Sequence, residues 1–143
     1  MGRIVNFSEA VSIGIHGMVL IARSDENLNV LRIAELTGAS KHHVAKIMQR
    51  LVKDNFLTST RGPNGGFVLK RPADSISILE IYESIDGAIS VEKCPMDNSI
   101  CPFELCLVGT VVNNATREIR SYFAKQKLSD YLGVKVYKTP KTL

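Results

Sequence analysis

Apolar residues recur every three or four positions in three successive stretches of the N-terminal part of the chain. The first stretch begins after Ser8, a favourable residue at a helix N-terminus, and runs to about Ala22. The second covers Val30 to Leu36 and is followed by Gly38, which tolerates the left-handed conformation that ends many helices. The third follows Ser40 and runs to about Leu51. This spacing predicts three helices, the last two separated only by a tight turn.

The third predicted helix divides its residues between an apolar face and a polar face. Val44, Ile47, Met48 and Leu51 form the apolar face, which we expect to be buried. The opposite face is polar or basic throughout and consists of Lys41, His42, His43, Lys46, Gln49 and Arg50.

Beyond the third helix the apolar period changes from about 3.6 residues to two. Residues 56–60 and 66–69 predict two strands, and the glycine-rich residues 61–65 between them predict a hairpin turn. Ser77 and Glu80 then match a capping box, which predicts a helix that ends at Gly87.

A long helix is predicted from about Pro102 to Lys127. Its apolar positions alternate three and four residues apart, as they do in a coiled coil: Leu105, Val108, Val112, Ala115, Ile119 and Tyr122. Because the other helices already form a core, this narrow row is best buried against a second copy of the chain, so it predicts a dimerisation helix. Packing within one chain is the alternative.

Positive charge is concentrated in the N-terminal half of the chain. Residues 1–72 contain ten Lys and Arg against five Asp and Glu, whereas residues 73–143 contain eight against nine. Between Lys41 and Arg71 seven basic residues accompany a single acid, Asp54. A basic surface of this kind favours contact with phosphates, although a solvated helix face is an alternative reading of charge alone.

The order of short helix, tight turn, basic helix and glycine-tipped hairpin predicts a winged helix-turn-helix. In that fold the N-terminal end of the second helix enters the major groove. The candidate DNA contacts on it are Ser40, Lys41, His42, His43 and Lys46, with Arg50 further along. Arg61, at the wing tip, is placed to enter a narrow minor groove, and a plain hairpin turn is the alternative. Adjacent histidines point about 100° apart on a helix, so no shared metal ion is expected.

All three cysteines lie close together, at Cys94, Cys101 and Cys106. Their odd number disfavours a disulfide framework. Structural zinc is a second choice because the histidines lie far upstream and the short C-x2-C spacing is missing. An iron-sulfur cluster, [2Fe-2S] or [4Fe-4S], accepts longer spacing and prefers thiolate ligands, so it is the first choice.

Several of these features occur together along nearly the whole chain, to about Leu132. They are the segments Ile33 to Leu36, Ser40 to Leu51 and Ser59 to Phe67, then the helix before Gly87 and the triple-cysteine loop. In this combination the chain resembles the winged-helix iron-sulfur transcriptional regulators of the IscR/NsrR type. The Arg-Gly-x-x-Gly-Gly wing followed by three cysteines is the specific part of the match.

The resemblance implies a cluster held by three cysteines and one further ligand. In one branch that ligand is a histidine three residues after the last cysteine, but this chain has Gly109 there. In the nitric-oxide-sensing branch it is an N-terminal acid of the partner subunit, which points to Glu9. A first-turn acid that favours the helix dipole is the alternative role of Glu9.

These observations predict a mainly α protein with one small β-hairpin. Residues 1–87 form the DNA-binding domain, 88–106 the cluster-binding loop, 102–132 the dimerisation helix region and 133–143 a mobile basic tail. The expected function is a cytoplasmic homodimeric repressor that binds a palindromic DNA operator under control of the cluster. The alternatives are a metal-free thiol sensor of the same fold and a protein-interaction module. Neither a membrane span nor catalytic machinery is predicted.

Overall fold

The computed structural model describes residues 5–91 and 101–135, so Cys94 and most of the predicted tail lie outside the described residues. The elements follow one another as α1 (Glu9–Arg23), α2 (Val30–Thr37), α3 (Lys41–Lys53), β1 (Leu57–Thr60), β2 (Gly66–Leu69), η1 (Ala73–Ser75), α4 (Ile78–Asp86), α5 (Gly109–Lys125) and η2 (Leu128–Tyr131). β1 and β2 pair antiparallel, with Leu57 opposite Leu69. The predicted fold class, mainly helical with one hairpin, is confirmed.

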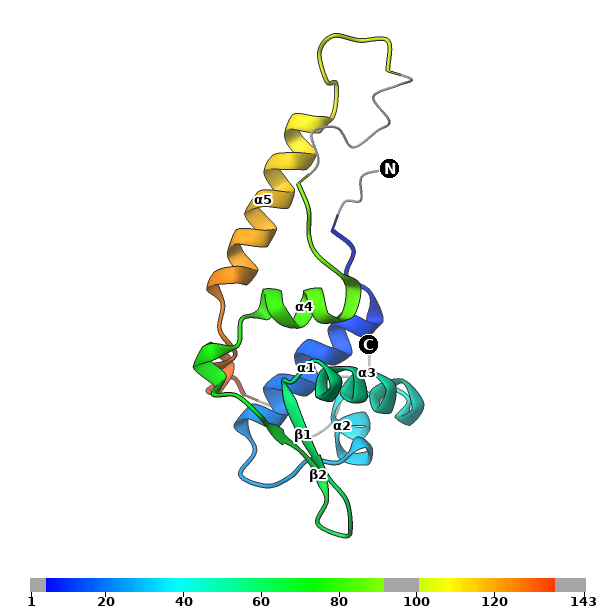
Figure 1. The fold of residues 1–143 in the computed structure, drawn as a ribbon, viewed down its shortest axis with the longest axis vertical. Coiled ribbons are helices and arrows are strands. Elements are labelled where there is room, and N and C mark those ends of the chain that lie inside the picture. The colour runs from blue at the N-terminus through cyan, green and yellow to red at the C-terminus, as the bar shows by residue number, and fades with distance from the viewer. Residues whose placement is uncertain (1–4, 92–100, 136–143) are drawn as a thin grey trace.

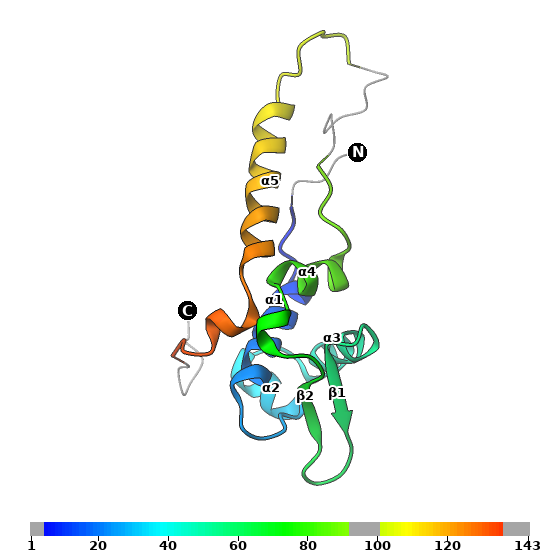
Figure 2. The ribbon, with the colours of Figure 1, turned by 60° about the vertical axis from the view of Figure 1, so that its left-hand side comes forward.

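The elements divide into a packed body and a projecting helix. α1 to α4 and the hairpin form the body, and α5 rises away from it (Figures 1 and 2). The hairpin lies at the opposite end of the molecule from the N-terminal end of α5. The wing and the projecting helix are therefore well separated in space.

Local hydrogen bonds explain where the helices of the body begin. Ser8, Asn29, Ser40 and Ser77 each accept a hydrogen bond from the backbone N–H three residues later. Each satisfies a donor that the first turn of a helix leaves unpaired. Gly38 ends α2 in the left-handed conformation, with φ of 75°. The short turn between α2 and α3 follows from these two caps.

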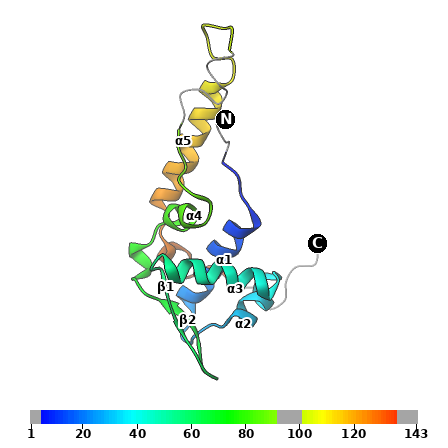
Figure 3. The same cartoon turned by 45° about the vertical axis from the view of Figure 1, so that its right-hand side comes forward.

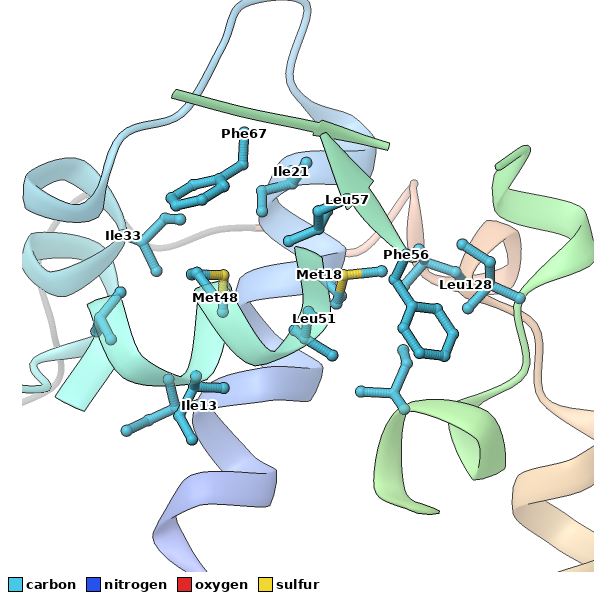
Figure 4. Packing of buried hydrophobic residues seen from close by; sticks show 14 of the residues in the cluster. Ile13, Met18, Ile21, Ile33, Met48, Leu51, Phe56, Leu57, Phe67 and Leu128 are labelled. Carbon is cyan, nitrogen blue, oxygen red and sulfur yellow. The ribbon is translucent and has the colours of Figure 1, made fainter. Parts of the chain in front are cut away.

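The core lies between α1, α3 and the hairpin (Figure 4). Met18, Met48, Leu51 and Leu57 are almost fully buried in it. α1 approaches α3 closely at Gly17, where an added Cβ would lie only 2.7 Å from the Met48 Cε. Since protein cores are close-packed, this approach fixes α3 on the body and leaves its polar face outward.

The base of α5 is fastened to the body at its C-terminal end. Ile78 N–H donates to the Gln126 carbonyl at 2.9 Å, and Leu128 N–H donates to the Ile76 carbonyl at 2.9 Å. Phe123 packs edge-to-face on Phe7, with ring centroids 5.7 Å apart. α5 is thus tied to the segment before α4 and to the residues before α1.

The predicted start of the long helix at Pro102 is wrong, because α5 begins at Gly109. Leu105 lies outside the helix and Val108 is its N-cap residue. Helices in proteins are stabilised mainly by packing of their apolar face. Leu105 is 76% exposed, so a helical turn there would bury nothing within one chain.

The lowered pKa of Glu80 is expected to make the stability of the fold depend on pH. Partial burial disfavours its charged form, but the Ser77 N–H and the Arg71 guanidinium hydrogen-bond its carboxylate, so its pKa is lowered from 4.5. A lowered folded-state pKa stabilises the fold above the unfolded-state value, and this stabilisation is lost as the pH falls through the folded-state value. Glu80→Gln is expected to flatten the loss of stability in acid below about pH 5, measured by urea unfolding. Glu26→Gln is the control, and a parallel acid response in Glu80→Gln and the unchanged protein would contradict this role.

Candidate nucleic-acid interface and cysteine loop

The outward face of α3 carries an exposed row of polar and basic side chains. Lys41, His42, Lys46 and Arg50 are all exposed, and the apolar residues of the same helix are buried beneath them. Figure 3 shows the helix lying on the outer side of the body. Ser40 is the N-cap, and its Oγ accepts from the His43 N–H at 3.2 Å. None of the ion pairs found within residues 5–91 and 101–135 involves Lys41 or Lys46. Their ammonium groups are therefore available to phosphates.

His43 departs from the expectation that the whole polar face is open. Its side chain is 33% exposed, and its Nδ1 lies 3.8 Å from the Glu9 Oε2. Glu9 is the first residue of α1 and is 74% exposed. Glu9 therefore occupies the first turn of α1, where a carboxylate interacts favourably with the helix dipole, as the alternative role requires. The structure brings Glu9 next to His43 on α3 of its own chain, 34 residues away in sequence.

The C-terminal half of α3 is linked to α4 through Asp54. The Ser84 hydroxyl donates to the Asp54 carboxylate, and the Arg50 Nε donates to the same oxygen at 3.2 Å. The Ser84 hydrogen bond and then the charge of Arg50 hold the pKa of Asp54 below its usual value of 3.8. Arg50, predicted as a DNA contact, is therefore ion-paired, whereas Lys46 is not.

The hairpin forms a wing whose tip is held by the loop before α2. Arg61 is exposed at the start of the tip. The Asn27 side chain donates to the Asn64 carbonyl at 3.1 Å, and Leu28 forms a bridge to Phe67. These contacts fix the tip beside the N-terminal end of α2. Asn27 and Asn64 carry no sequence signal for this pairing, because they are far apart and both are ordinary loop residues.

Gly66 makes the wing contact possible. Its φ is +153°, and an added Cβ would lie 2.6 Å from the backbone carbonyl of Leu28. Backbone atoms cannot rotate away as a side chain can, so Gly66→Ala is expected to destabilise the fold by about 2 kcal/mol. Urea unfolding measures the effect, and Gly133→Ala is the matched control because a Cβ there meets nothing within 4 Å. Equal stability of the two variants would show that the wing relaxes without cost.

The described part of the cysteine loop precedes α5. Cys101 is exposed, with its Sγ 3.9 Å from the Phe103 carbonyl oxygen, and Cys106 is half-buried. Cys94, the third predicted ligand, lies outside the described residues. Within the described ranges no group of three or more His, Cys, Asp or Glu side chains is close enough to hold a metal ion. The two described thiols lie within six residues and provide soft sulfur donors.

Exposed apolar side chains extend along α5 and the segment before it. Val111 is 75% and Tyr122 is 56% exposed, and Ala115 is exposed between them. Of the predicted dimerisation row, Val112 and Ile119 are half-buried. The described helices contain no segment long and apolar enough to cross a membrane.

Winged helix-turn-helix geometry, an open basic recognition helix and a projecting terminal helix define a DNA-binding regulator fold. Residues 7–133 match the model of the Rrf2 family, which is described as "Iron-dependent Transcriptional regulator". The chain belongs to the Rrf2 family of transcriptional regulators. The resemblance inferred from the wing and the cysteine loop is confirmed at this level.

Curated relatives of the chain are bacterial regulators. The IscR regulator of Xenorhabdus nematophila is 26% identical over 98 residues, which cover 68% of this chain and 60% of that protein. The IscR regulator of Klebsiella pneumoniae is 32% identical over 90 residues, covering 63% of this chain and 55% of that protein. The chain thus spans about three fifths of the length of the curated relatives it matches.

Solved structures share the fold over nearly the whole chain. CymR, described as the global cysteine regulator of B. subtilis, superposes with a TM-score of 0.77 at 20% identity, covering 92% of this chain and 98% of that one. T. potens IscR superposes with a TM-score of 0.71 at 19% identity, covering 96% and 94%. The oxidized form of Staphylococcus aureus CymR gives 0.72 at 20% identity, covering 94% and 100%.

Proposed function

We propose that this chain is a homodimeric, sequence-specific DNA-binding repressor whose affinity for a palindromic operator is controlled at the cysteine loop. The observation that carries the proposal is the exposed basic end of α3, together with Arg61 exposed at the tip of the wing. Lys41 and Lys46 lack a carboxylate partner among the described residues. We also propose that the protein acts on DNA in the cytoplasm.

The proposed readout assigns different tasks to α3 and the wing. The N-terminal end of α3 enters the major groove, where Ser40, Lys41, His42 and Lys46 contact base edges and phosphates. His43, half-buried beside Glu9, is proposed to position the helix as well as to contact DNA. Arg61 reads the width of the adjacent minor groove. Arg50, which is ion-paired with Asp54, is proposed to contact the DNA backbone from further along the helix.

Lys46 offers the direct test of DNA binding. The operator is first selected from random duplexes, and its affinity is then measured by fluorescence anisotropy at several salt concentrations. Lys46→Gln is expected to weaken binding and to reduce the slope of log affinity against log salt by about one, since one phosphate contact is lost. Lys135→Gln, an exposed lysine far from α3 in sequence, is the control. The absence of any sequence-selective binding would favour a protein-interaction module.

The finer proposal is that Cys94, Cys101 and Cys106 hold an iron-sulfur cluster, with Glu9 of the partner subunit as the fourth ligand. Soft thiolate donors suit this group, and the exposed Cys101 and Glu9 side chains are accessible to it. A bound cluster would supply a centre sensitive to oxidants, iron supply or nitric oxide. Iron and sulfide counts per subunit after oxygen-free purification test this directly, and a colourless, iron-free protein even after reconstitution would reject it.

The chain's own residues suggest how such control reaches DNA. The cysteine loop connects α4 to α5, and Ser84 of α4 is hydrogen-bonded to Asp54 at the end of α3. A group that restrains the loop would therefore restrain α3 through α4. It would also restrain α5, the proposed dimer helix, which follows the loop directly. Two recognition helices must lie about 34 Å apart to meet successive major grooves, so a small rotation of α5 changes affinity strongly.

A second candidate is a metal-free thiol sensor of the same fold. The exposed Cys101 favours it, because accessible thiols oxidise to sulfenic acid or to a disulfide. A solved relative, S. aureus CymR, is described in an oxidized form. An iron-free protein whose operator affinity changes on treatment with hydrogen peroxide would select this candidate over the cluster.

A further inference from the structure

A groove runs between α5 and the extended segment that follows α4. It has a volume of ≈ 500 Å³, which is within the range of about 300–1,000 Å³ found for small-molecule sites. Neither the proposed DNA contacts nor the described cysteines line it.

The floor of the groove is apolar and well supported. Ile89, Val91 and Ala124 line it, and Ile89 is only 8% exposed. Ile89 belongs to a buried cluster with Tyr82, and Phe123 and Ala124 pack against this cluster. The floor is therefore held by the packing between α4 and α5, and it can receive a hydrocarbon group without rearrangement of the body.

The rim of the groove is basic. Arg117, Arg120, Ser121 and Lys125 line it, and all four are exposed. Among the described residues none of the three cations forms an ion pair, and the one hydrogen bond found for them joins the Arg117 guanidinium to Asn114 at 3.5 Å. Three positive charges thus surround an apolar floor, and none of them is ion-paired with a carboxylate among the described residues.

The groove lies on a face of α5 that the proposed dimer does not use. At about 100° per residue, Arg117, Ser121 and Ala124 lie on the opposite side of the helix from the row of Val112, Ala115, Ile119 and Tyr122. Glu118, the acid of this helix, is not among the residues that line the groove. Dimerisation through the apolar row therefore leaves the groove open.

We propose that this groove binds a small organic anion, a carboxylate with an aliphatic tail. Guanidinium groups match carboxylates in a two-point geometry, so Arg117 and Arg120 hold the charged end with Lys125 and the Ser121 hydroxyl beside them. The tail lies on Ile89, Val91 and Ala124. Since Val91 lies three residues before Cys94, the ligand would hold the entry to the cysteine loop against α5. Binding itself requires neither DNA nor a cluster.

Octanoate is the probe for this proposal. Isothermal titration calorimetry of the full chain gives the affinity, and backbone amide shifts locate the site. Acetate has the anion without the tail, and octylammonium has the tail with the opposite charge. We expect both to bind at least about tenfold more weakly than octanoate, with octanoate shifts centred on Ser121 and Ala124.

Two variants separate charge from shape. Arg120→Gln is expected to weaken octanoate binding about tenfold, and Ala124→Tyr, which fills the floor, is expected to abolish it. Arg32→Gln removes a guanidinium from α2 and serves as the control, with thermal melts reporting the fold of each variant. The proposal is overturned if octanoate shows no saturable binding. It is equally overturned if octylammonium binds as well, or if neither groove variant changes the affinity.

Discussion

Ala115→Asp is expected to convert the proposed dimer into a monomer and to lower operator affinity by about a hundredfold or more. Ala115 is exposed on α5 between Val111 and Tyr122, two apolar side chains that are 75% and 56% exposed. Apolar surface of this kind is stabilised by burial against a second copy. In a two-fold dimer the substitution acts on both copies at once. A monomer contacts only one half of the operator. It therefore loses the increase in affinity that two linked DNA-binding domains provide.

Sedimentation velocity measures the oligomeric state, and fluorescence anisotropy measures operator affinity. Asn114→Asp is the matched control, since it adds the same charge to the neighbouring exposed position of α5 but about 100° away around the helix. It should remain dimeric. A dimeric Ala115→Asp protein with unchanged DNA affinity would show that the exposed apolar row of α5 is not the contact between copies.

Cys101→Ala is expected to reduce bound iron to background and to change operator affinity by about tenfold or more. A thiolate is lost from a proposed set of three, and the sequence has no fourth cysteine to replace it. Coupling between a ligand site and a second site is commonly worth about 5- to 150-fold in affinity. The direction of the change reports whether the cluster-bearing form binds or leaves the DNA.

The experiment compares both proteins, purified without oxygen, on the same operator. Thr110→Ala is the control for the region, because Thr110 is exposed in the first turn of α5 and has no sulfur. Iron content and visible absorbance are measured together with the affinity. Identical affinity of Cys101→Ala and the unchanged protein, with iron present only in the latter, would reject the switch while leaving the cluster in place.

Helix starts in the body of the molecule were predictable because they depend on short-range interactions. Ser8, Ser40 and Ser77 each bond a backbone N–H only three residues away, so the capping pattern can be read directly along the chain. The hairpin was equally predictable from its period of two and its glycine-rich turn. The open basic face of α3 followed from the burial of Val44, Ile47, Met48 and Leu51 on the other side.

The start of α5 was not predictable in this way. The apolar spacing continues back to Leu105, but the helix begins at Gly109, since a repeat in sequence does not say whether a surface is available to bury it. The groove between Val91 and α5 was also missed. Its apolar and basic residues come from two segments that only the packing of α4 against α5 brings together.

Taken by itself, the sequence determined the winged-helix order, the basic recognition helix and the grouping of the cysteines, because each depends on local spacing or composition. The tertiary structure alone decided which polar residues meet. His43 lies beside Glu9, Asn27 holds Asn64, and Ser84 bonds Asp54, across 34, 37 and 30 residues respectively. Such partners are selected by how the buried faces of α1, α3 and α4 pack, and close packing of side chains is a property of the whole core rather than of any one segment.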